Sequence, residues 1–331
     1  MAGLFPKRIH IKFFATSRRM RHEVFNSTAP VRKSAHPGSI SVSLILAVLF
    51  FLLTSLIIGA PTRGSDEPQQ VALKNGQTSS NLNGLVRDVL QHEVRAQAED
   101  DSLWCFRKLQ EKDGKVELFA SCQTKGAEIN RLLAVDGKPL NVQQSAAEEK
   151  RIEKLLNDRD LLKKRHQQQD DDAKQAATIL KILPDAFVFE QEKNDGERIT
   201  LRFSPNPNFH PSGFAAQVLY HLKGTLKLDL RQKRLVEISG QLESEVKFLG
   251  GVLGHLDRGG TFFVKQQEIT PGCWEMTTMD VRMDGKALLF KTISVRSKEL
   301  DTDFHRVSPT TSIQEIAMLT TEAGRESQQQ K

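Results

Sequence analysis

Residues 235–248 read LVEISGQLESEVKF and decide the fold. The even positions from 236 to 248 hold Val, Ile, Gly, Leu, Ser, Val and Phe, while the odd positions from 237 onward hold only polar or charged residues. Successive side chains of a β-strand point to opposite faces, so a period of two gives one apolar and one solvated face. This pattern predicts one long strand of an antiparallel sheet.

The same alternation continues on both sides of this stretch. Before residues 235–248, the alternation occurs at 199–203 and at 226–230. A short helical piece is expected between these two stretches, at Ala215–His221. Further strands are expected at Thr261–Ile269, Trp274–Met283 and Ala287–Arg296. The last two are separated by Asp284-Gly285, a dipeptide typical of tight hairpin turns. Residues 185–306 therefore predict a meander of long strands joined by short turns.

Helical patterns dominate the region before the meander. Leu85–Asp100 predicts a short helix, and residues 145–176 predict a charged helical arm. The arm opens with the capping-box pattern Ser145–Glu148 and carries a narrow apolar stripe at 152–156. A second apolar cluster stops at Pro184. Strands and helices in separate runs predict an α+β fold with helices covering the sheet.

An apolar segment near the N-terminus predicts a membrane span. Residues 40–60 read ISVSLILAVLFFLLTSLIIGA, and these 21 residues include no charge. A helix of this length crosses a hydrocarbon core of roughly 30 Å. Basic residues crowd its N-terminal side, so the positive-inside rule places the tail in the cytoplasm and the bulk of the chain outside it. We expect a single-pass protein of the inner (cytoplasmic) membrane with a periplasmic domain.

A cleaved signal peptide is the alternative, and it would make the protein secreted. The segment is longer than the usual apolar core of such peptides, and Ile58 stands where a small residue is expected, so an uncleaved anchor is favoured. The expected organisation is a basic cytoplasmic tail 1–39, the transmembrane or signal-anchor helix 40–60, a flexible spacer 61–82, an exported α+β domain 83–307 and a polar tail 308–331.

The net charge of +6 does not predict nucleic-acid binding. Residues 1–39 hold eight basic side chains and one acidic one, which leaves 39 of the 47 basic and 40 of the 41 acidic residues for the rest of the chain. A phosphate-binding groove needs clustered Lys and Arg in the folded part. The basic isoelectric point therefore reflects the tail, and no nucleic-acid partner is expected.

Two of the three cysteines form a disulfide candidate. Asp113-Gly114 predicts a two-residue hairpin turn, so Lys112 pairs with Lys115 and Cys105 faces Cys122 at a non-hydrogen-bonded position. Facing residues there lie close enough for a disulfide, which persists in an oxidising compartment. Two buried free thiols are the alternative. Cys273 is left over.

Signatures of chemistry are weak. The Gly-rich stretch 250–260 precedes a strand and lacks the Lys-Ser/Thr of a phosphate loop, so a tightly packed loop is favoured over a nucleotide site. His255 and Asp257 lie two residues apart and could form part of an acid–base pair, but the sequence shows no nucleophile that such a pair would activate. The histidines and cysteines match no zinc spacing. We therefore assign no catalytic, cofactor-binding or metal residue.

One hairpin carries a family resemblance. Gly224-Thr225-Leu226-Lys227-Leu228-Asp229, a basic turn and then Leu235–Gly240 follow a short helix, and this arrangement resembles the LolA/LppX/RseB-like half-barrel group of bacterial envelope proteins. The resemblance implies a strongly curved antiparallel sheet with helices across its concave side. It also implies binding or sensing of lipid or lipoprotein acyl chains. The charged arm and the anchor depart from the group, and the anchor favours a fixed binder or sensor over a shuttle.

The expected function is therefore non-catalytic binding of an apolar ligand, a lipid or a lipoprotein acyl chain, or of an envelope partner. Two alternatives stay open: an enzyme with an unrecognised site, such as a hydrolase, and a purely structural envelope module. The state of the apolar sheet face separates these functions. An open face would form a ligand cavity, whereas a face filled by helices would be a core.

Overall fold

The structure is a computed structural model that describes residues 76–287 and 291–329, with side chains for 81–287 and 291–322. The predicted tail 1–39, the membrane segment 40–60 and most of the spacer lie outside these residues. Within the described ranges, no helix is both long and apolar enough to cross a bilayer.

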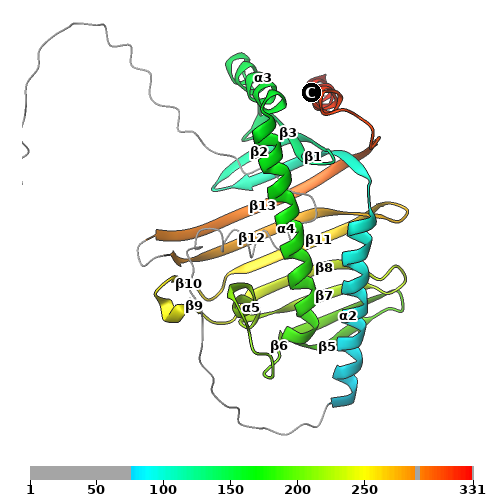
Figure 1. The fold of residues 1–331 in the computed structure, drawn as a ribbon, viewed down its shortest axis with the longest axis vertical. Coiled ribbons are helices and arrows are strands. Elements are labelled where there is room, and N and C mark those ends of the chain that lie inside the picture. Colours follow the sequence, from blue (N-terminus) through cyan, green and yellow to red (C-terminus); the bar gives the residue numbers. More distant parts are fainter. Residues whose placement is uncertain (1–75, 288–290, 330–331) are drawn as a thin grey trace, which may run out of the picture. The chain divides into compact units, whose positions relative to one another are not determined.

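A large antiparallel sheet forms the centre of the fold (Figure 1). Its main order is β4-β3-β2-β1-β13-β12-β11-β8-β7-β6-β5, and β9 and β10 join through β12. The strands are β1 (Leu103–Lys112), β2 (Lys115–Gln123), β3 (Glu128–Val135), β4 (Lys138–Pro139), β5 (Phe187–Asn194), β6 (Arg198–Pro205), β7 (Leu222–Asp229), β8 (Arg234–Leu242), β9 (Val246–Phe248), β10 (Gly254–Leu256), β11 (Thr261–Thr270), β12 (Cys273–Ala287) and β13 (Lys291–Val307). The sheet is curved, and together with its helices it confirms the predicted α+β class.

Helices cover one face of this sheet, which we call the inner face. Figure 1 shows α2 (Gly76–Glu99) and α4 (Arg159–Ala186) running side by side across the strands. The short α5 (Phe214–Leu219) packs beside α4. Over β5 to β8 the inner face is filled by side chains, since Leu201 and Leu228 are fully buried in one continuous core with α2 and α4. The apolar face that the sequence predicted is therefore a helix-covered core in this region.

A buried carboxylate fastens α2 to the sheet. Glu93 is 0% exposed, and its oxygens accept hydrogen bonds from Arg234 Nε at 2.8 Å and from the backbone N–H of Leu235 at 3.1 Å. The side-chain amides of Gln97 and Gln266 also donate to it, at 2.8 and 3.3 Å. Because burial strips water from a carboxylate, these donors replace its hydration, and the network fixes the position of α2 over β8 and β11.

A second cluster lies on the opposite, outer face of the sheet. Cys122, Ile129 and Val307 pack against Ile316 of α6 (Ile313–Gln329). Arg131 on β3 reaches the same helix, where its Nε donates to Thr320 Oγ1 at 3.1 Å. The segment expected to be a polar tail thus contains a helix that packs on β2 and β3.

The helix α3 (Val142–Asn157) protects the open edge of β3, which β4 covers only at its end. Glu148 accepts a hydrogen bond from the backbone N–H of Leu132 at 2.8 Å, and Arg151 donates to the backbone carbonyl of Asn130. An uncovered edge strand invites pairing with other chains, so side chains that bond its backbone act against aggregation.

The predicted turn at Asp284-Gly285 is wrong, because both residues lie inside β12. Asp284 pairs with Ser294 and Gly285 with Ile293 on β13. Gly285 serves a different purpose, since a Cβ atom there would lie 2.2 Å from the carbonyl oxygen of His255. The glycine lets β10 approach the backbone of β12, which sequence distance alone does not reveal.

The predicted strand 236–248 is divided. The chain bends at Glu243 and Ser244, so β8 ends at Leu242 and the alternation resumes in β9. Val236, Ile238 and Leu242 are buried as the period of two requires, while Ser244 is exposed. The period identified the buried face correctly but did not identify the bend.

Two helix limits also differ from the prediction. The helix predicted to open at Ser145 begins earlier, because Asn141 and Gln144 form the capping box. The helix α4 continues through Pro184 to Ala186. Proline is tolerated there because it removes only a hydrogen bond of the last turn, and Asn83 Nδ2 donates to the Pro184 carbonyl at 2.7 Å.

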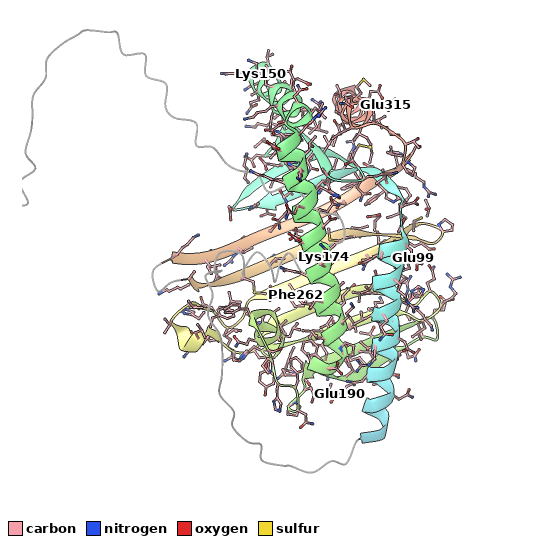
Figure 2. All side chains as sticks on the ribbon, in the orientation of Figure 1. Glu99, Lys150, Lys174, Glu190, Phe262 and Glu315 are labelled. Atoms are coloured by element: carbon pink, nitrogen blue, oxygen red, sulfur yellow. A yellow bond between two sulfur atoms is a disulfide. The ribbon has the colours of Figure 1, made fainter. Side chains whose placement is uncertain are left out.

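Replacing Glu93 tests its role as the fastener of α2. We expect Glu93→Ala to lower the free energy of unfolding by about 3–5 kcal/mol, because it leaves the buried Arg234 guanidinium without its carboxylate. Urea unfolding followed by circular dichroism measures this. Glu99→Ala, at the exposed end of the same helix (Figure 2), should change it by less than about 0.5 kcal/mol. Equal effects of the two substitutions would contradict the assignment.

Candidate functional site

The inner face changes from apolar to charged between β11 and β1. On β1 the even-numbered residues Trp104, Phe106 and Lys108 are buried and share the inner face. Lys108 pairs across the sheet with Asp301 of β13. Glu128 of β3 and Glu299 of β13 complete what we call the buried charge cluster (Lys108, Glu128, Glu299 and Asp301), none of which is more than 5% exposed.

Short distances hold this cluster together. Lys108 Nζ lies 2.5 Å from Glu128 Oε1 and 3.5 Å from Glu299 Oε1. Gln110 Nε2 donates to Glu299 Oε2 at 3.3 Å. One ammonium thus ties three strands, β1, β3 and β13, through charge-assisted contacts.

The cluster holds more acid than base, and this shifts its pKa values. Burial raises the pKa of Asp301 well above its ordinary value, and the Glu299 and Glu128 carboxylates add to the rise although the Lys108 ammonium opposes it. Burial alone would lower the pKa of Lys108, but the three carboxylates outweigh burial and hold that pKa above its ordinary value. Lys108 therefore stays charged, while Asp301 resists ionisation.

The helix α4 also carries buried or partly buried charged groups, and one of them, Arg165, interacts with the cluster. Its buried residues change from apolar ones at 176–183 to Asp172, and burial raises the pKa of the Asp172 carboxyl. Burial lowers the pKa of Arg165, the nearby Arg151 lowers it further, and Glu128 opposes both. No group of three or more His, Cys, Asp or Glu residues in the described part of the chain has a geometry that could hold a metal ion. The cluster can bind strands together and store a proton, and we assign it no catalysis.

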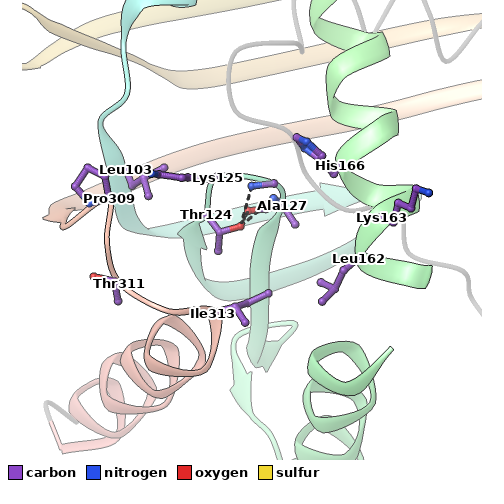
Figure 3. A pocket seen from close by; sticks show the side chains of 11 residues that line it. Leu103, Thr124, Lys125, Ala127, Leu162, Lys163, His166, Pro309, Thr311 and Ile313 are labelled. Carbon is purple, nitrogen blue, oxygen red and sulfur yellow. Dashed lines mark hydrogen bonds between the residues drawn. The ribbon is translucent and has the colours of Figure 1, made fainter. Parts of the chain in front are cut away.

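A crevice opens beside the charged end of the inner face (Figure 3), and we call it the β2–β3 crevice. Its volume is about 460 Å³, within the range of roughly 300–1,000 Å³ typical of small-ligand sites. The described residues that line it include no Asp or Glu. They are Leu103, Thr124, Lys125, Gly126, Ala127, Leu162, Lys163, His166, Pro309, Thr311 and Ile313.

Four segments far apart in the sequence build this crevice. The turn between β2 and β3 is rigid, because Thr124 Oγ1 donates to the Ala127 carbonyl at 2.7 Å and accepts from its backbone N–H at 2.9 Å. Gly126 lies against the ring of His166 on α4, where an added Cβ atom would come within 3.4 Å of the imidazole. In Figure 3 Leu103 lies on one side of this turn, Leu162 lies on the other, and Ile313 lies below it.

The crevice is amphipathic. Leu103, Ala127, Leu162 and Ile313 supply apolar walls, whereas Lys125 and Lys163 are exposed. The imidazole of His166 also lines the crevice; its side chain is 50% exposed, and its Nε2 lies 3.8 Å from Asp170 Oδ2. An apolar cleft with cationic groups at its mouth is complementary to a molecule with an acyl chain and an anionic head.

A second groove of about 470 Å³ lies between α2 and α4. Leu90, Val94 and Leu180 line it together with Arg87. Arg87 is already paired, since its Nη2 lies 2.7 Å from Asp185 Oδ1. Arg95 and Lys181 also line this groove, so both hollows combine apolar walls with basic side chains. We take the β2–β3 crevice as the candidate site because four segments far apart in the sequence build it.

The predicted cysteine pair is confirmed. Cys105 faces Cys122 in the β1–β2 hairpin, the turn falls at Asp113-Gly114, and a disulfide joins the two residues across a Cα–Cα distance of 4.0 Å. The alternative of two free thiols is thereby excluded in this structure. Cys273 is free and partly exposed.

The structure places His255 between two acids without a nucleophile. Its Nε2 lies 3.3 Å from Asp257 and its Nδ1 lies 3.7 Å from Glu245. A serine does contact another histidine, since Ser244 Oγ lies 2.7 Å from His221 Nδ1. In the described part of the chain, however, no carboxylate bonds His221, so the third member of a catalytic triad is missing there.

Sequence reasoning missed the crevice and the charge cluster for different reasons. The crevice joins positions 103, 124–127, 162–166 and 309–313, and no local pattern connects them. The cluster did leave a signal, because Lys108 continues the alternation of Trp104 and Phe106 onto the buried face. A lysine in register with buried aromatic residues predicts a buried partner of opposite charge.

Comparisons with known proteins do not assign a family. No protein-family description matches the sequence, and no curated protein is significantly similar to it. One solved structure, a DUF1329 family protein from Desulfovibrio piger, is similar over 68% of this chain and 95% of that chain, with 9% identity and a TM-score of 0.23. The resemblance to the LolA/LppX/RseB-like group is not confirmed by these comparisons and stays a prediction.

Removing the disulfide should destabilise the domain. Replacing both Cys105 and Cys122 with Ala opens a link between residues 17 positions apart, for which chain entropy gives a loss of about 3 kcal/mol in the free energy of unfolding. Urea unfolding of the full chain under non-reducing conditions measures the loss. Cys273→Ala serves as the control and should have little effect. A double variant as stable as the parent would contradict a structural role for the disulfide.

The stability of the protein should depend on the proton of Asp301. Its pKa is raised in the folded state, so folded protein holds the proton longer than unfolded protein does, and stability falls as pH rises from about 4 through the raised pKa. We expect Asp301→Asn to remove much of this fall, and urea midpoints measured between pH 4 and 8 test it.

Asp284→Asn is the matched control for this pH series. The hydrogen bond from Arg296 lowers the pKa of Asp284, so its contribution to stability has the opposite sign and is lost as pH falls. A pH profile that is unchanged in Asp301→Asn would show that Asp301 ionises normally.

Proposed function

We propose that this chain is a non-catalytic binding module, exported and held at the inner membrane by residues 40–60, which takes an acyl chain with an anionic head into the β2–β3 crevice. The observation that carries the proposal is the pairing of apolar walls with Lys125, Lys163 and His166 in one cleft of about 460 Å³. Free fatty acids and the acyl chains of lipids or lipoproteins have this chemistry.

The filled inner face supports the crevice as the binding site. Half-barrel binders need space between the sheet and its helices, whereas here the side chains of α2, α4 and the strands beneath them are buried together. The crevice lies at the end of α4 instead, where Leu162 borders it. An acyl chain there gains hydrophobic burial without moving a helix.

The disulfide supports the proposed location. Disulfides persist in the periplasm and outside cells and are rare in the cytosol. The Cys105–Cys122 bond therefore favours a domain that folds outside the cytoplasm, as the charge distribution around residues 40–60 also does. A tethered domain of this kind acts as a fixed binder or sensor.

Photo-crosslinking of a diazirine-bearing fatty acid to the full chain in membranes tests this function. We expect the label on residues of the crevice, mapped by mass spectrometry after proteolysis. Ile313→Asp should reduce labelling by roughly tenfold or more, because a carboxylate in the apolar cleft is desolvated and repels the anionic head.

Met318→Asp is the matched control, since it places the same charge at a residue of α6 that is 58% exposed and does not line the crevice. Labelling there should match the parent. If both variants label as strongly as the parent, or if the label is spread over the surface, the crevice is not the acyl site.

A further inference from the structure

The Gly-rich stretch that matched no nucleotide site forms an apolar projection. A 3₁₀ turn, η1 (Leu249–Gly251), joins β9 to β10, and we call residues 249–252 the β9–β10 tip. Leu249 is 56% exposed and Val252 is 65% exposed. Two exposed aliphatic side chains at one loop tip depart from the small polar residues that turns favour.

The tip is built to hold these side chains outward. Leu249 has a φ of 48° and the two glycines after it have φ values of 65° and 95°, a left-handed run that turns the chain back tightly. Directly before the tip, Phe248 is buried and its ring packs edge-on against Phe214 at 5.2 Å. Phe248 thus anchors the loop in the core, while Leu249 and Val252 remain exposed and available for binding.

Basic residues surround the tip. Lys247, His255 and Lys286 lie opposite one another on the neighbouring strands β9, β10 and β12. Lys291 follows on β13, where it pairs with Ala287. Two acids are present, but Glu245 lies within 3.3 Å of Lys247, and Asp257 lies 3.3 Å from His255. The lysines on β12 and β13 therefore give this end of the sheet an excess of positive charge.

Size and shape decide between a lipid and a protein as the occupant. A stable protein interface buries roughly 800 Å² on each partner, which two side chains on a narrow projection do not supply. Aliphatic residues at a tip, with lysines behind them, instead match a bilayer interface, where apolar groups enter the acyl region and ammonium groups meet lipid phosphates.

We propose that the β9–β10 tip inserts Leu249 and Val252 into the surface of a bilayer that contains anionic lipid. The inference uses the proposed membrane tether only to bring the bilayer near: residues 61–75 separate the apolar segment from α2 and span at most about 50 Å when fully extended. The tether and the tip together would hold the domain in a fixed orientation, by two points of contact on one membrane.

Depth-dependent quenching in the full chain tests the proposal. An environment-sensitive fluorophore is placed at Val252→Cys in a Cys273→Ser background, and the chain is reconstituted into vesicles of phosphatidylcholine with or without phosphatidylglycerol. We expect doxyl-labelled lipid to remove most of the fluorescence in the anionic vesicles and less of it in the neutral ones. Adding Leu249→Asp should abolish the quenching, and Lys286→Glu with Lys291→Glu should reduce it.

Val142→Cys is the matched control, because this valine is 89% exposed on α3 and lies outside the tip. Its label should not be quenched. If the chain floats with the vesicles but the label at 252 is not quenched, the tip inference is wrong and the tether stands. If the chain does not float with the vesicles at all, both the tether and the tip inference fail.

Discussion

The structure depends on how one helix, α4, matches a sheet whose inner face changes character along its length. Over β5 to β8 the sheet is apolar, and the helix presents its apolar residues of 176–183. Towards β1 and β3 the sheet carries the buried charge cluster, and the helix presents Arg165, whose guanidinium interacts electrostatically with Glu128. Burying a charged strand under an apolar helix would cost several kcal/mol for each unpaired ion, so the two patterns must stay in register.

The position of α4 on the sheet determines where the β2–β3 crevice lies. The apolar part of α4 fills the space above the sheet, so the N-terminal end of the helix, with Leu162, Lys163 and His166, reaches the β2–β3 turn. The outer-face cluster fixes the other wall, because α6 packs on β2 and β3 and brings Ile313 to the same place. The crevice thus forms where the helix layer of the inner face, α4, meets the helix layer of the outer face, α6, beside the β2–β3 turn.

Much of the sheet was predictable from sequence because its signals are local. A period of two identified the buried side of β6, β7 and β8, and Asp113-Gly114 fixed the register that brings Cys105 to Cys122. Asp284-Gly285 has the same composition and is not a turn, because the glycine is needed for contact with β10. Composition does not distinguish these two uses of glycine.

The sequence did not predict contacts between residues that are far apart in the chain. No sequence period shows that Lys108 meets Glu128 and Asp301, or that residues 103, 162 and 313 share a cleft. Nor did the sequence decide whether helices leave the apolar face open, because that depends on how closely α2 and α4 approach the sheet. Glu93 and its bond to Arg234 settle this in the structure, and neither residue belongs to an apolar pattern.

Hydrogen–deuterium exchange of the full chain, with and without a saturating fatty acid, tests most directly the claim that the inner face is closed and that the ligand enters the crevice. The account predicts that the ligand slows exchange at 124–127, 161–166 and 309–313, while β7, β8 and the facing parts of α2 and α4 exchange slowly and unchanged. A ligand that instead alters exchange in β7, β8 and α2, as it would if it entered between helices and sheet, would contradict the account.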